Sequence, residues 1–161
     1  MQPLLDRILT LNLIASTIVF YVAARIYLLP HLDRLRARAV LPPILLLHAL
    51  RHLGLMFLTR GAVYAGMPPQ FAWPAALGDF ATALLALAAL FALLRESRAA
   101  RAMVWTFNVF GTLDLLDAIV LANVYGVPPY TGPAYWIPAF WVPMLLVTHY
   151  VTFVILIRRQ I

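Results

Sequence analysis

Cysteine and lysine are both absent from this sequence, and charge of either sign is scarce. Without cysteine the chain has no disulfide, no thiolate metal ligand and no thiol redox chemistry. Without lysine it has no Schiff base and no lysine nucleophile, and all 12 basic residues are arginine. Only 11% of the residues are charged, whereas 64% are hydrophobic and the mean hydropathy is +0.89. A soluble domain of 161 residues cannot cover its surface with so few polar side chains, so the composition predicts an integral membrane protein.

Five apolar segments are long enough to cross a bilayer. A helix needs about 20 apolar residues to span a hydrocarbon core of roughly 30 Å. The predicted spans are 8–29, 41–59, 72–94, 102–124 and 135–157. We therefore expect an all-α integral membrane protein, a bundle of five transmembrane helices that forms one transmembrane domain over residues 1–161. Pro138 and Pro143 predict an irregular outer half of the last span.

The arginines predict the orientation of the bundle. They gather in alternate connections and at the C-terminus, and the other two connections contain only Arg60. By the positive-inside rule, the arginine-rich side is cytoplasmic, so the N-terminus is outside and the C-terminus is cytoplasmic. The arginines that carry this prediction are Arg34, Arg36, Arg38, Arg95, Arg98, Arg101, Arg158 and Arg159.

The same residues bear on location and partners. The stretch RLRAR, at 34–38, lies beside a predicted span, so it is interpreted as a topology signal and not as a nucleic-acid patch. Arginine in place of lysine, with much alanine and leucine, fits a GC-rich bacterial genome, so we expect the bacterial inner membrane. The lipid bilayer is the predicted partner, together with a small lipophilic ligand. The chain is expected to act as a homo-oligomer or as a subunit of a larger membrane complex.

Four of the five spans carry ionisable or amide side chains at similar depth. A charged side chain at the bilayer centre costs at least about 2.5–3.5 kcal/mol, so these groups should face inward and meet one another. A rise of about 1.5 Å per residue places them in one band near mid-depth. The predicted polar centre comprises His48, Arg51, His52, Asp79, Asn108, Asp114, Asp117 and His149.

A metal or small-ligand site is the first interpretation of this centre. His48 and His52 are spaced i, i+4 on the stretch HALRH and can chelate one ion from one helix face. Nitrogen and carboxylate ligands suit Zn²⁺ or non-haem iron, and an open coordination position would activate water against a lipophilic substrate. The predicted metal ligands are His48, His52, Asp79, Asp117 and His149, and the predicted ligand-binding side chains are Arg51, Asn108 and Asp114.

The pair of histidines with a distant His149 resembles the three-histidine centre of intramembrane hydrolases of the adiponectin-receptor and alkaline-ceramidase type. Those proteins have seven spans and carry the paired histidines near the C-terminal end, so the chain is not assigned to that family. Whether the protein is an enzyme stays open.

Two alternatives remain beside the metal site. His48 and His149 lie at matching depth on different spans, as the ligands of a b-type haem in a redox subunit would. The polar centre is also compatible with a non-catalytic membrane subunit, in which it holds helices together or conducts protons.

Overall fold

The computed structural model describes residues 2–32 and 34–158 of the chain. It is 85% helical, and the described residues form no strand. The long α-helices are α1 (Gln2–Ala23), α2 (Ala37–Ala49), α3 (Pro69–Leu94), α4 (Ala100–Val124) and α5 (Val142–Arg158). The shorter turns are η1 (Ala24–Leu28), η2 (Leu29–His31), η3 (Leu50–Leu58), η4 (Pro128–Tyr130), η5 (Gly132–Tyr135) and η6 (Ile137–Trp141).

Five helices are long and apolar enough to cross a membrane, which confirms the predicted number. They cover Arg7–His31, Ala37–Leu58, Pro69–Leu94, Ala100–Val124 and Gly132–Arg158. The third begins three residues before the predicted span because Pro69 occupies the first helical position, where its missing N–H is not needed. Sequence hydropathy gives the bounds of the apolar segment, whereas the helix begins before that segment.

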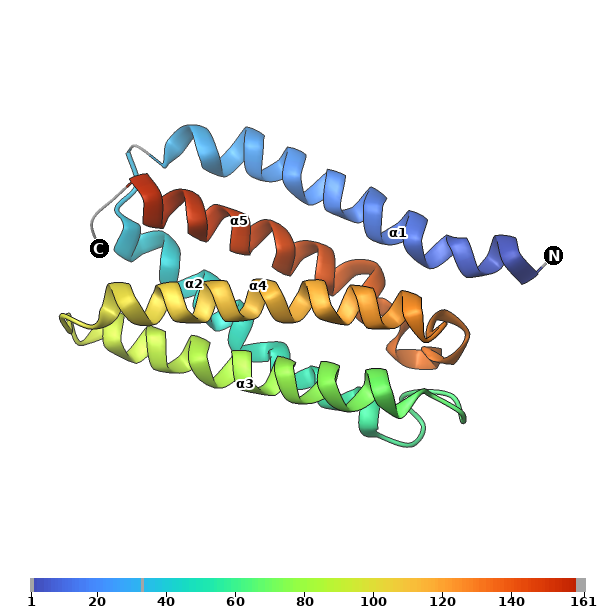
Figure 1. The fold of residues 1–161 in the computed structure, drawn as a ribbon. Helices are drawn as coiled ribbons and strands as arrows, with labels where there is room; N and C mark the ends of the chain where they lie inside the picture. The colour runs from blue at the N-terminus through green and yellow to red at the C-terminus, as the bar shows by residue number, and fades with distance from the viewer. Residues whose placement is uncertain (1, 33, 159–161) are drawn as a thin grey trace.

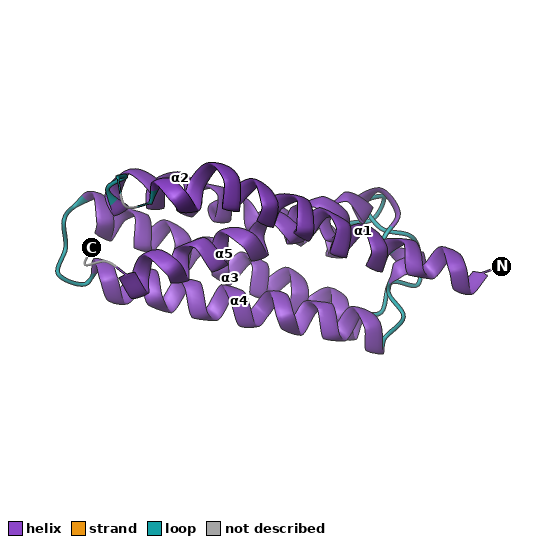
Figure 2. Cartoon of the chain, turned by 90° about the horizontal axis from the view of Figure 1, so that it is seen from above, coloured by secondary structure: helices purple, strands orange, loops and turns teal. Residues whose placement is uncertain are grey.

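The helices run lengthwise in one elongated bundle, with the connections gathered at its two ends (Figures 1 and 2). Helix α3 packs against α4 and against α2 with η3, and α5 packs against α4 and α1. Helix α1 lies on the outside, beside α5 (Figure 1), and in the first span, residues 7–31, only Leu9 and Ala24 are buried. The core is therefore built mainly from the other four spans.

Two apolar clusters fill this core, and the polar centre lies between them. The first cluster includes Leu45, Phe107 and Leu156, and the second includes Phe57 and Ile137. Along each of the four spans, the buried polar residues come in sequence between members of the two clusters. Apolar packing on both sides thus encloses the polar groups near the middle of the bundle.

Three spans contain irregular helix. The first span ends in the π-helical turn η1 and the 3₁₀ turn η2. The last span contains the π-helical turn η6 with Pro138, and this confirms the predicted irregularity. The second span changes at Leu50 from α-helix to nine residues of 3₁₀-helix, far longer than the three or four that are usual. The segment that carries Arg51 and His52 is therefore wound differently from an α-helix.

Candidate functional site

Arg51 lies at the middle of the polar centre and is only 1% exposed. Its Nε donates a hydrogen bond to Asp79 Oδ1 at 2.6 Å, and its Nη2 forms an ion pair with Asp114 Oδ2. Its Nη1 donates to the carbonyl oxygen of Gly111 at 3.0 Å. One guanidinium thus links η3 to α3 and α4. Each of its three nitrogens donates to an acceptor, which the single ammonium group of a lysine could not reproduce in this planar arrangement. The predicted meeting of Arg51 with aspartates from opposite spans is confirmed.

Three glycines leave the space that these ionisable side chains occupy. A methyl group built on any of them would overlap a neighbouring side chain of the centre, at less than 3.0 Å. A Cβ on Gly54 would lie 2.1 Å from Asp79 Oδ2, and one on Gly78 would lie 1.6 Å from Asp114 Oδ1. A Cβ on Gly111 would lie 2.7 Å from His149 Cε1. The helices approach closely at the polar centre because these positions carry no Cβ.

His149 joins the centre from α5 and is 1% exposed. Its Nε2 lies 3.3 Å from Arg51 Nη1, and its Nδ1 lies 2.8 Å from Asn108 Oδ1. Because a guanidinium can only donate, His149 Nε2 accepts, and the ring proton is assigned to Nδ1, which donates to Asn108. Asn108 also donates through Nδ2 to the carbonyl oxygen of His149 at 3.3 Å. The predicted ligand-binding residue Asn108 therefore orients His149.

His48 is fully buried beside His149, with 4.2 Å between the ring centroids. Its Nε2 lies 2.9 Å from Thr148 Oγ1, and that hydroxyl also lies 3.0 Å from carbonyl oxygens of the preceding turn of α5. A hydroxyl has one hydrogen, which goes to a carbonyl, so Thr148 accepts from His48 Nε2–H. Nδ1 of His48 is then a buried acceptor without a hydrogen-bond partner in the described part of the chain.

His52 and Asp117 do not join the centre, so the expectation that every polar group faces inward is wrong for these two. His52 is exposed, and its Nδ1 lies 3.0 Å from the carbonyl oxygen of Ala49. Successive residues of a 3₁₀-helix are turned by about 120°, so the 3₁₀ winding of η3 turns His52 away when Arg51 faces the core. Asp117 is exposed because it is turned by about 60° from Asp114, which takes the place beside Arg51.

The predicted metal set is consequently not assembled. Among residues 2–32 and 34–158, no three histidine or carboxylate side chains are grouped so that they could hold a metal ion. The histidines do not fit a haem either, because His48 Nε2 faces Thr148 and His149 Nε2 faces Arg51, not a common iron position. The i, i+4 spacing of HALRH fails as a metal signal because it assumes a regular α-helix through Leu50.

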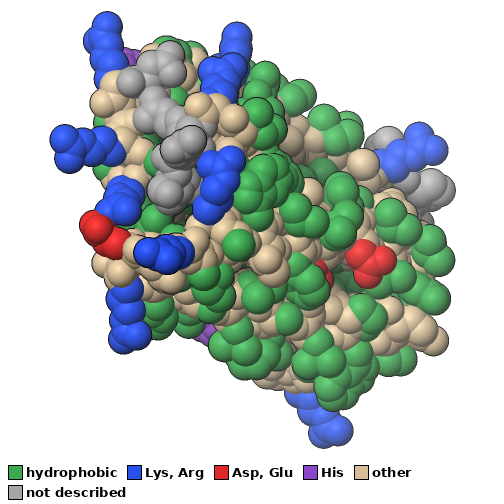
Figure 3. Space-filling model, turned by 60° about the vertical axis from the view of Figure 1, so that its left-hand side comes forward, with side chains coloured by type: hydrophobic (Ala, Val, Ile, Leu, Met, Phe, Trp, Pro, Cys, Tyr) green, Lys and Arg blue, Asp and Glu red, His purple; other side chains and the backbone are tan. Residues whose placement is uncertain are grey.

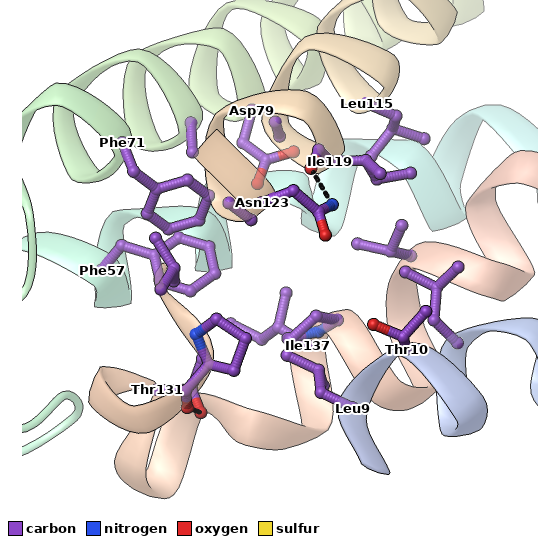
Figure 4. A pocket seen from close by; sticks show the side chains of 18 residues that line it. Leu9, Thr10, Phe57, Phe71, Asp79, Leu115, Ile119, Asn123, Thr131 and Ile137 are labelled. Atoms are coloured by element: carbon purple, nitrogen blue, oxygen red, sulfur yellow. Dashed lines mark hydrogen bonds between the residues drawn. The ribbon is translucent and has the colours of Figure 1, made fainter. Parts of the chain in front are cut away.

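A cavity of about 100 Å³ adjoins the polar centre. Its wall is mostly apolar and comes from α1, η3, α3, α4 and the segment between α4 and α5. Figure 4 shows the carboxylate of Asp79 pointing toward this space, with Thr10, Asn123 and Thr131 as the other labelled polar side chains around it. The cavity is not predictable from the sequence, because most of its lining residues are apolar and look like any other lipid-facing or core positions.

Comparison with known proteins places the chain in a family. A family model described as a domain of unknown function, DUF8737, matches residues 8–157, and the chain belongs to this family. No curated protein and no solved structure is similar to it.

Proposed function

We propose that this protein is embedded in a membrane and binds a small, largely apolar ligand in the cavity that ends at Asp79. The observation that carries the proposal is the carboxylate itself. Arg51 holds Asp79 from one side through Oδ1, and the other side of the same residue lines an apolar cavity. A fixed carboxylate at the end of a mostly apolar wall is the arrangement that selects a ligand by its polar group.

The charges favour a ligand that donates a hydrogen bond or carries a positive charge. When both carboxyl groups are ionised, one arginine and two aspartates give the centre a formal charge of −1 (+1 for Arg51, −2 for Asp79 and Asp114). Asp79 Oδ2 has no hydrogen bond within the described residues, so it can accept one from a hydroxyl or an ammonium group. Away from water, such a charge-assisted bond is stronger than a neutral one.

The size of the cavity limits what can enter. Its volume of about 100 Å³ is below the roughly 300–1,000 Å³ of sites for drug-sized molecules. It therefore suits a short amphiphile, or the polar end of a longer one whose chain extends toward the lipid. The ligand-binding role predicted for Arg51 and Asp114 becomes an indirect one here, since Arg51 holds Asp79 and Asp114 in turn pairs with Arg51. Neither a metal ion nor a haem is part of the proposal.

We infer the orientation in the membrane from the positions of the arginines. Figure 3 shows arginine side chains gathered at one end of the molecule, over a surface that is otherwise largely apolar. This end would be cytoplasmic, with the N-terminus outside, and the cavity would lie in the outer half of the bilayer. The composition supports a bacterial inner membrane as the location.

The test is a thermal-shift titration of the detergent-purified protein with three amphiphiles of equal chain length, octylamine, octanol and octanoate. A ligand that binds the folded state raises the unfolding temperature by mass action. We expect octylamine to stabilise most, octanol less, and octanoate not at all, because Asp79 repels a second carboxylate.

Two variants make the titration specific. Ala122→Leu adds volume to the cavity wall and should abolish the shift, whereas Leu84→Phe adds volume on the exposed face of α3 and should leave it unchanged. Equal shifts with all three amphiphiles, or an undiminished shift in Ala122→Leu, would reject the proposal and indicate simple partitioning into the detergent.

A structural role for the polar centre is the second candidate, and the completeness of the Arg51 network favours it. The guanidinium joins three spans and touches the histidine of a fourth. This role needs no ligand. It predicts that Ala122→Leu changes nothing measurable, while replacement of Arg51 destabilises the protein whether or not an amphiphile is present.

A further inference from the structure

A second cavity lies at the arginine-rich end of the bundle, away from Asp79. Its volume is about 200 Å³, and it is formed where the end of the first span meets α5. Its lining residues are Arg25, Leu29, Pro30, Tyr150, Val154 and Arg158. Two arginines from different spans thus share one small cavity with four apolar or aromatic side chains.

Both arginines line this cavity, and no carboxylate is among its lining residues. Neither Arg25 nor Arg158 has an ion pair or hydrogen bond within the part of the chain that the structure describes. By contrast, Arg38 at the same end is paired with Glu96. Two like charges at one site repel each other, and a bound anion would turn that repulsion into two attractive contacts.

Local structure brings Arg25 to this side of α1. The ring of Tyr21 contacts that of Tyr150, with 5.8 Å between the centroids, so this face of α1 is turned toward α5. Arg25 follows Tyr21 by four residues and continues the same face. It lies in the π-helical turn η1 (Ala24–Leu28), and π turns inside helices occur frequently at functional sites.

We propose that this cavity binds the phosphate group of an anionic membrane lipid. Arginine pairs with phosphate through parallel N–H donors, which makes it the residue of choice for phosphate recognition. Arg158 ends the last candidate span, so it lies where lipid headgroups are found. Tyr150 precedes it by eight residues, about 12 Å along the helix.

The polarity of the cavity favours a lipid over a free phosphate ion. Leu29, Pro30 and Val154 give it apolar walls beside the arginines. The cavity therefore offers charged partners for a phosphate group and apolar and aromatic contacts for the part of the lipid next to it. This inference rests on the proposed membrane placement, but it does not depend on ligand binding at Asp79.

Native mass spectrometry of the detergent-purified protein tests the site. The protein is titrated with phosphatidylglycerol and, separately, with phosphatidylcholine of the same acyl chains, and each is repeated with excess inorganic phosphate. We expect tighter binding of phosphatidylglycerol and a loss of about tenfold in its affinity in the double variant Arg25→Gln/Arg158→Gln. Inorganic phosphate should compete weakly.

The matched control is Arg95→Gln/Arg98→Gln, which removes the same charge at the same end but outside the cavity. It should keep the affinity for phosphatidylglycerol within about twofold. An equal loss in both double variants would overturn the site, because the attraction would then be diffuse. Full competition by inorganic phosphate would show a site for a free anion and would overturn the lipid assignment.

A third variant keeps the test decisive if the double variant does not fold. Val154→Trp fills the cavity and leaves the charge unchanged, so it should weaken phosphatidylglycerol binding as well. Undiminished binding in Val154→Trp would overturn the proposal. None of these outcomes bears on the amphiphile titration at Asp79, so the two proposals fail separately.

Discussion

The polar centre around Arg51 and the cavity beside it share Asp79 but are built in opposite ways. In the centre each nitrogen of the guanidinium has an acceptor, and glycines on three spans leave room only for the side chains already there. The cavity has apolar walls and one carboxylate whose outer side is open. In the interior of a membrane an unpaired polar group costs several kcal/mol, whereas an unfilled apolar wall loses only dispersion contacts. The satisfied polar centre therefore stabilises the fold, and the unfilled cavity provides the space in which a ligand can bind.

Replacement of Arg51 should have the largest effect on stability. Arg51→Met leaves two carboxylates facing each other in the core without their cation, and breaking a buried ion pair in this way costs about 3–5 kcal/mol. We expect this loss in the free energy of unfolding, measured by denaturant titration in detergent.

Two further variants separate the charge from the packing. The triple variant Arg51→Met/Asp79→Asn/Asp114→Asn should recover part of the loss, because no uncompensated charge remains. Arg60→Met, at an exposed arginine, is the control and should be close to neutral. A triple variant no more stable than Arg51→Met would mean that the guanidinium acts through its shape and not through its charge.

Gly78→Ala should have the next largest effect. Its Cβ would lie 1.6 Å from Asp114 Oδ1, so the ion pair with Arg51 must shift. We expect a loss of about 3 kcal/mol, at the upper end of the usual range for overpacking, in the same denaturant titration. Combining Gly78→Ala with Asp114→Ala tests the cause, since the two losses should then be far from additive. Simple additivity would contradict the overlap.

Asn108→Leu should cost less, about 2 kcal/mol. It removes the acceptor of His149 Nδ1–H and leaves that donor buried and unpaired. Thr106→Val is the control on the same helix, because Thr106 is exposed, lies outside the cavity and donates its hydroxyl to the carbonyl oxygen of Ala102. Thermal unfolding of both variants in one detergent gives the comparison. Equal losses would show that Asn108 does not orient His149.

The smallest effects should come from the two polar residues outside the centre. His52→Ala and Asp117→Asn should each change the free energy of unfolding by less than about 0.5 kcal/mol, because both side chains are exposed. Denaturant titration of each variant beside Arg51→Met gives the contrast directly. A loss of several kcal/mol at either position would place that residue inside the polar network and would break the distinction made here.

The helices of this protein follow from the sequence with little ambiguity. Apolar runs of about 20 residues predict spans by length alone, and all five candidate spans agree with the predicted ones within a few residues at each end. The depth of the polar residues was predictable in the same way. A constant rise per residue places Arg51, Asp79 and Asp114 in one band near mid-depth, although their helices run in opposite directions.

Which side chains share the centre was decided only by the tertiary structure. His48 and His52 are on one face of an ideal α-helix, and only the change to 3₁₀ winding at Leu50 separates them. No local preference in the sequence signals that change.

The sequence by itself determined that the chain forms five long apolar helices and that its few buried charges must meet at mid-depth, because length, hydropathy and the cost of buried charge are properties of the residues. The tertiary structure decided the partners. Close approach at Gly54, Gly78 and Gly111, the winding of η3 and the position of α1 select Arg51, Asp79, Asp114, Asn108 and His149 and leave a cavity beside them. Such choices depend on angles and gaps between helices, which arise only when the helices pack.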